Sequence, residues 1–265
     1  MSRIIRLVIA FAVAFAALVT TVSAQQNQPS DRQAQAVANR AIADLAAWKN
    51  QNARNYLQKQ KAKFGSTPQF QAAWALLEVQ EGAGAKKALA TSGTTTLSKM
   101  SKNKSVDAMA AYFYGEILNQ QKKRQEANAA WQVAAKSAAA AVKADPTDAT
   151  AQFYLGAALV RAKRFEEARA ALRLAVRGGF NEPMVNHQIG LSYMFAKKWK
   201  EAKDAFDLGL SVEPRYAPMY FYRAMAWDEL GRKDNMLIDF DQYLKLAPNG
   251  PDAGFAKSVL QSSGR

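Results

Sequence analysis

The sequence predicts an all-α fold in which antiparallel helical hairpins stack into a solenoid. Equivalent residues recur every 34 positions in the C-terminal half, and a fixed period of this size is typical of stacked helical repeats. Apolar residues elsewhere fall at i, i+3 and i+4 spacing, which indicates helices with one apolar face. The residues that close successive units show the period directly: Pro146, Phe180, Pro214 and Pro248.

The first 24 residues are predicted to form a cleavable signal peptide. Arg3 and Arg6 precede an apolar run, and small residues before and at Ala24 place the expected cleavage after that residue. The alternative is an uncleaved membrane anchor, but the apolar run of 7–19 is shorter than the roughly 20 residues of a spanning helix. We therefore expect a periplasmic or secreted protein with no transmembrane span in the mature chain.

The composition and the motifs argue against several kinds of functional site. The chain has no cysteine, which excludes disulfides and thiolate metal sites. Its formal net charge is +14, and such a charge attracts anionic partners. His187 is the single histidine and has no metal-ligand spacing around it. The paired carboxylates do not converge on one helix face, and the glycines lack the context of a phosphate loop. We therefore predict no metal, no cofactor and no enzymatic activity.

The N-terminal part of the mature chain is interpreted as a polar tether, 25–30, followed by degenerate helical hairpins over 31–105. The first hairpin is expected to turn at 50–52 and to end before Gly65. Pro68 suits the first turn of the next helix. Within 85–105, the Gly- and Thr-rich stretch of 91–96 favours turns or a frayed helix. We expect 85–105 to be the least ordered part of the mature chain.

Four units are predicted in register, 108–146, 149–182, 183–216 and 217–250, followed by a capping helix at 251–265. The alanine-rich second helix of the first unit is expected to be longer than the others. Small residues one period apart leave room where the two helices of a unit cross, and bulky residues fill the space between units. The small residues are Gly156, Gly190 and Ala224, and the bulky residues are Leu172, Phe206 and Phe240.

These residues resemble the tetratricopeptide repeat family, in its exported bacterial type. The pattern is carried by Leu155, Gly156, Leu159, Ala168 and Leu172, by Ile189, Gly190, Tyr193, Ala202, Phe206 and Pro214, and by Tyr220, Ala224, Trp227, Phe240 and Pro248. Gln152 and Asn186 replace bulky residues of the pattern, and Arg223 stands where Leu is expected. The resemblance is weak over 31–105.

The resemblance implies a superhelix whose inner wall is formed by the first helix of each unit. It implies a non-enzymatic scaffold that binds a peptide or helix of a partner protein in this groove. The alternative is that these aromatic residues only pack between helices. The groove residues expected from the resemblance are Tyr112, Glu116, Asn119, Phe153, Arg161, His187, Met194, Phe221, Met225 and Asp228.

A second expected feature is a basic ridge, because the turn inside each hairpin is rich in Lys and Arg. Turns one unit apart should align along one edge of the solenoid. The ridge would suit an envelope adaptor that binds anionic polymer or lipid; the alternative is that these charges only solvate the turns. Nucleic acid is not an expected partner of an exported protein. The ridge consists of Lys122, Lys123, Arg124, Lys163, Arg164, Lys197, Lys198, Arg232 and Lys233.

Overall fold

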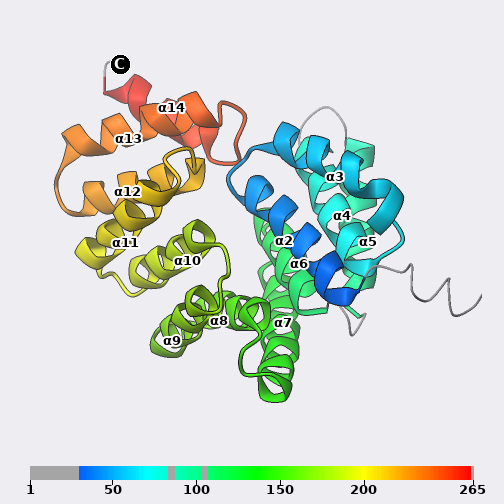
Figure 1. Cartoon of the computed structure of the whole chain (residues 1–265). Helices are drawn as coiled ribbons and strands as arrows, with labels where there is room; N and C mark the ends of the chain where they lie inside the picture. The colour runs from blue at the N-terminus through cyan, green and yellow to red at the C-terminus, as the bar shows by residue number, and fades with distance from the viewer. Residues whose placement is uncertain (1–29, 83–86, 103–106, 264–265) are drawn as a thin grey trace, which may run out of the picture.

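A computed structural model describes residues 30–82, 87–102 and 107–263 of the chain. Within these residues it contains thirteen helices and no strand (Figure 1). The predicted signal peptide lies outside the described residues. In the described part, no helix combines the length and the apolar character needed to cross a bilayer. The helices that precede the four predicted units are α2 (Asp31–Ala46), α3 (Asn50–Phe64), α4 (Pro68–Gly82) and α5 (Lys87–Met100).

The helices pack as antiparallel pairs, as the sequence predicts. Each predicted unit holds one pair, and the last helix follows the fourth pair. The second helix of the first unit has 21 residues and is the longest in the described chain. The pairs are α6 (Asp107–Gln120) with α7 (Arg124–Ala144), α8 (Ala149–Arg161) with α9 (Phe165–Arg177), α10 (Glu182–Phe195) with α11 (Trp199–Val212), and α12 (Ala217–Glu229) with α13 (Lys233–Leu246), followed by α14 (Ala253–Ser262).

Two local predictions in the N-terminal part are wrong. The stretch of 91–96 is not a turn or a frayed end, because it lies inside the continuous helix α5. The hydroxyls of Thr91 and Thr94 donate to backbone carbonyls four residues earlier, and Gly93 is buried directly against the backbone of Ala75 in α4. The first hairpin turns at 47–49 and not at 50–52, since α3 already begins at Asn50.

Close helix crossings occur in three of the four pairs, and they confirm the role predicted for Gly156 and Gly190. A Cβ atom placed on Gly156 would lie 2.6 Å from the side chain of Leu172, and one on Gly190 would lie 2.2 Å from Phe206. The same arrangement recurs between Gly115 and Trp131. In each pair the bulky side chain therefore occupies the space that the glycine leaves. Phe206 also reaches the next unit, where its ring stacks 6.3 Å from that of Tyr222.

Arg223, where the repeat pattern expects Leu, joins three helices by ion pairs. Its guanidinium lies 2.7 Å from a carboxylate oxygen of Asp207 in α11 and 2.7 Å from one of Asp239 in α13. The Asp239 carboxylate is almost completely buried and depends on this pairing. A charged network thus replaces an apolar contact at this position.

The chain closes on itself. In Figure 1 the turn between α2 and α3 lies beside the segment that joins α13 to α14. Trp48, in this turn, packs against the apolar cluster of the last repeat. Lys49 Nζ lies 2.7 Å from Glu213 Oε2, which follows α11. Farther along α2, Asn39 Nδ2 donates to Thr150 Oγ1 of α8 over 2.9 Å. The N-terminal hairpin therefore contacts both the middle and the end of the solenoid, and it covers part of the solenoid's inner side.

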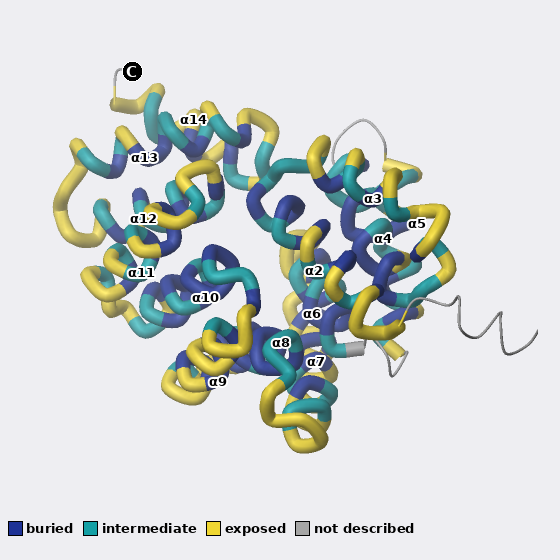
Figure 2. Tube along the Cα trace, viewed as in Figure 1, coloured by how far each residue is buried: buried dark blue, intermediate teal, exposed yellow. Residues whose placement is uncertain are grey.

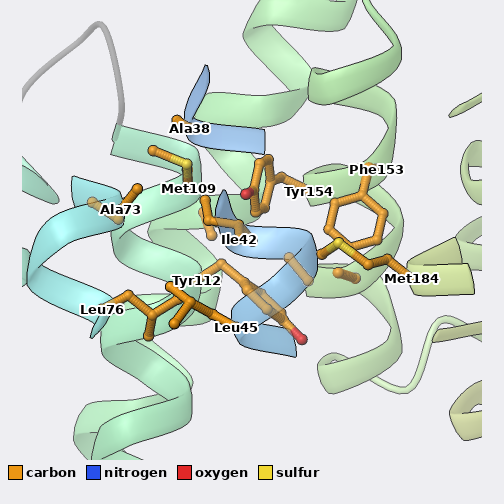
Figure 3. Close-up of a cluster of buried hydrophobic side chains, with 14 of the residues drawn as sticks. Ala38, Ile42, Leu45, Ala73, Leu76, Met109, Tyr112, Phe153, Tyr154 and Met184 are labelled. Carbon is orange, nitrogen blue, oxygen red and sulfur yellow. The ribbon is translucent and has the colours of Figure 1, made fainter. Parts of the chain in front are cut away.

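Buried residues line the inner side of the ring, while the exposed ones follow its outer edge (Figure 2). Near α2, a single apolar cluster joins the N-terminal hairpins to the first two regular repeats. Figure 3 shows Ile42 and Leu45 of α2 close to Tyr112 of α6 and Phe153 of α8. All four side chains are buried. Helix α2 thus covers the beginning of the inner wall.

Candidate functional site

The inner side of the ring encloses a cavity of about 980 Å³. Binding pockets for small ligands span roughly 300–1,000 Å³, so this cavity is large by that measure. The N-terminal hairpins, the first helices of the repeats and the segment after α13 all contribute to it. Its lining mixes aliphatic, polar and aromatic side chains, and the aromatic ones are Trp48, Tyr112, Phe113, Phe153, Tyr216, Tyr222 and Tyr243. We call this cavity the enclosed cleft.

One charged pair stands in the wall of the cleft. Arg161 Nε and Nη2 donate to the two carboxylate oxygens of Glu116 over 2.7 and 2.6 Å. The guanidinium also lies over the rings of Trp131 and Phe195, 5.2 and 5.6 Å from their centroids. A bidentate pair of this kind neutralises both partners and fixes their orientation. The pair links α6 to α8 and leaves neither charge uncompensated.

His187 sits among tyrosines. Its ring centroid is 5.4 Å from that of Tyr216 and 5.5 Å from that of Tyr222. Burial, reinforced by the nearby positive charge of Arg161, lowers the pKa of His187 to about 3. The imidazole is therefore neutral at neutral pH. Its Nε2 atom is buried and has no hydrogen-bond partner among the described residues.

Two glutamines in the lining are only partly satisfied. Gln188 Nε2 donates to the hydroxyl of Tyr112 over 3.1 Å, and Gln80 Nε2 donates to the carbonyl of Leu45 over 3.2 Å. Within the described chain, the buried Oε1 atom of each glutamine has no partner. Together with His187, they place three unpaired buried polar groups among the residues of the lining.

The structure divides the predicted groove residues into separate places. Six of them line the enclosed cleft: Tyr112, Glu116, Asn119, Phe153, Arg161 and His187. Met194, Met225 and Asp228 instead line a second cavity of about 310 Å³ beside α14, and Phe221 is buried in the apolar cluster of the last repeat. Tyr112, Phe153, Met194 and Phe221 are all buried. The burial of these four side chains fits the alternative interpretation, in which they only pack between helices.

Sequence reasoning missed the tyrosines that complete the cleft. Tyr216 precedes α12, Tyr222 lies within it, and Tyr243 belongs to a second helix that the repeat pattern assigns to the outer layer. Trp48 enters from the N-terminal turn. The period gives no signal for these positions, because they reach the cleft only when the ring is closed.

The nine residues of the basic ridge are exposed, in the four turns inside the hairpins of the regular repeats. Only Arg164 and Arg232 form ion pairs among the described residues, with Glu167 and Asp234. The first three turns each hold a lysine in the left-handed region, with φ of 62° at Lys122, 60° at Lys163 and 57° at Lys197. The fourth has Gly231 at φ 72°. Residues other than glycine rarely adopt this backbone conformation.

The comparisons with known proteins agree with this architecture. Residues 127–182 match the tetratricopeptide repeat family. Tetratricopeptide repeat sequence is therefore present over 127–182. A thermophilic tetratricopeptide repeat protein of Thermus thermophilus has the same fold, with a TM-score of 0.54 and 18% identity over 74% of this chain and 99% of that one. The prediction of a tetratricopeptide repeat fold is therefore confirmed.

Two other solved structures are less similar. The Cut9–Hcn1 hetero-tetramer of APC/C gives a TM-score of 0.49 and 17% identity over 94% of this chain and 45% of that one. PilF of Pseudomonas aeruginosa gives a TM-score of 0.37 and 17% identity over 87% of this chain and 100% of that one. A search of curated proteins finds no significant sequence match.

Proposed function

We propose that this protein is a non-enzymatic interaction scaffold of the bacterial envelope, and that it binds a segment of a partner protein in the enclosed cleft. The observation that carries the proposal is the cleft itself, a cavity of about 980 Å³ lined by aliphatic, polar and aromatic side chains. Tetratricopeptide repeats commonly serve protein association, which supports a protein partner. The basic, apolar start of the sequence supports export.

The contacts around the cleft limit the size of the partner segment that can bind in it. Helix α2 covers the beginning of the inner wall, and the contact of Lys49 with Glu213 bridges its far end. These contacts leave a partner segment less room to reach the cleft than an open inner wall would. This arrangement favours a narrow segment of polypeptide over a folded domain.

Photocrosslinking in cells tests this function. A benzoylphenylalanine at Tyr222, which lines the cleft, should capture a partner protein. The same residue at Arg173, exposed on the outer helix α9, is the matched control and should not capture it. Equal capture from both positions, or capture from Arg173 alone, would refute binding in the cleft. Mass spectrometry of the mature protein checks export, with Gln25 expected at its N-terminus.

A second candidate function is an envelope adaptor that binds an anionic surface through the basic ridge. The supporting observation is that three turns, one in each successive hairpin, place lysine where glycine is conformationally easier. Vesicles containing phosphatidylglycerol should then sediment the protein at low salt and release it at high salt. Replacement of Lys122, Lys163 and Lys197 by Ala should abolish this sedimentation. Binding that survives high salt or the triple substitution would argue against the ridge.

A further inference from the structure

We infer that the enclosed cleft binds the cationic side chain of a lysine or arginine of the partner, and that Asp252 supplies the counter-charge. This site rests on the proposed function and adds the chemistry of the partner segment. Three features carry it: a carboxylate without a counter-charge, its accessible position in the cleft, and the rings that lie near it.

Asp252 stands at the N-cap position of α14 without capping that helix. An aspartate there usually accepts a hydrogen bond from a backbone N–H of the first helical turn. The carboxylate of Asp252 accepts none. Its backbone makes the contacts instead: its N–H donates to the hydroxyl of Tyr243 over 3.2 Å, and its carbonyl accepts from the N–H of Ala256 over 3.0 Å. The backbone is therefore held in place while the carboxylate is left for another partner.

The Asp252 carboxylate has no counter-charge among the described residues. Burial raises the pKa of this carboxyl, and no described cation lies close enough to oppose that effect. The other carboxylate of the lining, Glu116, is already bound by both ends to Arg161. A half-buried negative charge that lacks a partner gains more from a cation than a solvated or paired one does.

A ligand in the cleft has access to this carboxylate. Asp252 lines the cleft and is half-buried, and neither of its carboxylate oxygens is fully enclosed. Asn249 and Pro251, from the same segment, also line the cleft and are exposed. Ammonium and guanidinium groups carry several donors, and their hydrogen bonds to a carboxylate are among the stronger ones in proteins.

Two partly exposed rings of the lining lie near Asp252. Trp48 packs against the apolar cluster that includes Ala253, the next residue after Asp252. In Figure 1 the turn that carries Trp48 lies beside the segment between α13 and α14. Burial raises the pKa of Tyr222 to about 12, and the nearby charge of Asp252 adds to this effect. Cations bind favourably over such rings, and the apolar stem of a lysine or arginine packs against them.

The charge of the whole chain makes binding of a cation here a local property. With a formal net charge of +14, the protein repels cations in general. The one other charged side chain of the lining outside the pair of Glu116 and Arg161 is Lys87, which is exposed on α5. A cation that binds must therefore do so through Asp252 and the rings near it.

Ligand-observed NMR at pH 7 tests the site on the full mature chain. N-acetyl-lysinamide and N-acetyl-argininamide carry the cation, and at least one should bind with a Kd in roughly the millimolar range. N-acetyl-norleucinamide keeps an apolar stem without the charge, and N-acetyl-aspartate is an anion. Both should bind at least about ten-fold more weakly. No binding of either cationic probe, or equal binding of the uncharged or anionic one, would overturn the assignment.

Cadaverine distinguishes a protein side chain from a free amine as the source of the cation. This diamine carries the same ammonium group without a peptide backbone, and it should bind no more tightly than N-acetyl-lysinamide. Tighter binding of cadaverine would assign the site to a free amine and overturn the side-chain proposal.

Variants locate the binding. Asp252→Asn removes the charge but keeps the shape, so it should weaken the cationic probes about ten-fold and leave N-acetyl-norleucinamide unchanged. Glu201→Gln is the matched control, because it removes the same charge from an exposed residue of α11 outside the cleft. It should have no effect. Asp252→Ser, also suited to the N-cap position, serves if Asp252→Asn fails to fold. Unchanged affinity in the folded variant would refute the assignment.

The site and the scaffold function fail separately. If crosslinks from Tyr222 capture a partner equally in the parent chain and in Asp252→Asn, and the cationic probes show no preference, the site is wrong and the scaffold function stands. If the probes bind as expected while the crosslinks capture nothing, the cleft holds a basic group and the scaffold function is wrong.

Discussion

Lys49 and Glu213 are 164 residues apart in sequence, yet their side chains form an ion pair of 2.7 Å. Trp48, next to Lys49, packs against the last repeat. Trp48 holds a left-handed backbone conformation with φ of 61°, which is uncommon for a bulky residue. The turn that carries both residues thus fastens the N-terminal hairpin to the far end of the solenoid.

Lys49→Glu should loosen this fastening, because it places two carboxylates face to face. Spin labels on cysteines introduced at Asn52 and Val212, both exposed, would report the separation by pulsed electron resonance. The native chain has no cysteine that would compete for the label. We expect a narrow distance distribution in the parent chain and a broader, longer one in Lys49→Glu. Global stability should change by about 1 kcal/mol or less, because both side chains are partly exposed.

The charge-reversed pair provides the control for this experiment. Lys49→Glu combined with Glu213→Lys should restore the narrow distribution. Lys59→Glu, on the exposed side of α3, changes the net charge equally and should have no effect. If Lys49→Glu leaves the distribution unchanged, the ion pair does not hold the ring closed.

Gly190→Ala should destabilise the protein by about 1–3 kcal/mol, the usual cost of overpacking a core. The added methyl group would meet Phe206 at 2.2 Å. Gly254→Ala is the matched control, because a Cβ there meets no atom within 4 Å in helix α14. It should stabilise by up to about 1 kcal/mol through helix propensity. Urea unfolding measures both, and a neutral Gly190→Ala would contradict the close crossing.

His187 should make the protein less stable in acid. Its pKa is about 3 in the folded state and near 6.5 in the unfolded state. Between these values the unfolded chain binds more protons, so the stabilising contribution is complete above pH 6.5 and falls as pH decreases. From pH 6.5 to pH 5 the loss should reach at most about 2 kcal/mol.

The comparison of the parent chain with His187→Phe isolates this contribution, since other titrating groups are common to both. Urea unfolding at pH 7 and pH 5 should show a steeper loss of stability in the parent. Parallel pH dependence in the two proteins would mean that His187 is protonated in the folded state at pH 5.

Lys163→Gly should stabilise the protein by about 0.5–1 kcal/mol, because Lys163 has φ of 60° and glycine adopts this conformation without steric cost. Lys163→Ala removes the same charge but keeps the Cβ atom, so it should give no such gain. Gly231→Ala should lose a similar amount at the equivalent turn. Chemical denaturation of the three variants separates backbone strain from charge, and equal effects of Gly and Ala at 163 would exclude strain.

The repeat architecture could be predicted because its determinants are local and periodic. Gly156 and Gly190 occur 34 residues apart, and each meets a bulky residue of the same hairpin. The alanine-rich composition of α7 likewise predicts its unusual length. Such features recur in every unit, so one sequence displays them several times.

The closure of the ring and the lining of the cleft could not be predicted in this way. Trp48, Tyr216 and Tyr222 meet there only through contacts between the first and last parts of the chain. The continuation of helix α5 through 91–96 could not be predicted either, because the Thr and Gly residues there disfavour a helix locally. Burial of Gly93 against α4 outweighs that preference.

The ion pair and the tryptophan that join the two ends also constrain how this protein can change in length. In an open solenoid, each repeat contacts only its neighbours, so repeats can be added or lost one at a time. Here an extra repeat between α8 and α12 would carry Glu213 out of reach of Lys49. The geometry of these contacts thus fixes the number of repeats. The two ends of the solenoid should unfold together instead of fraying independently.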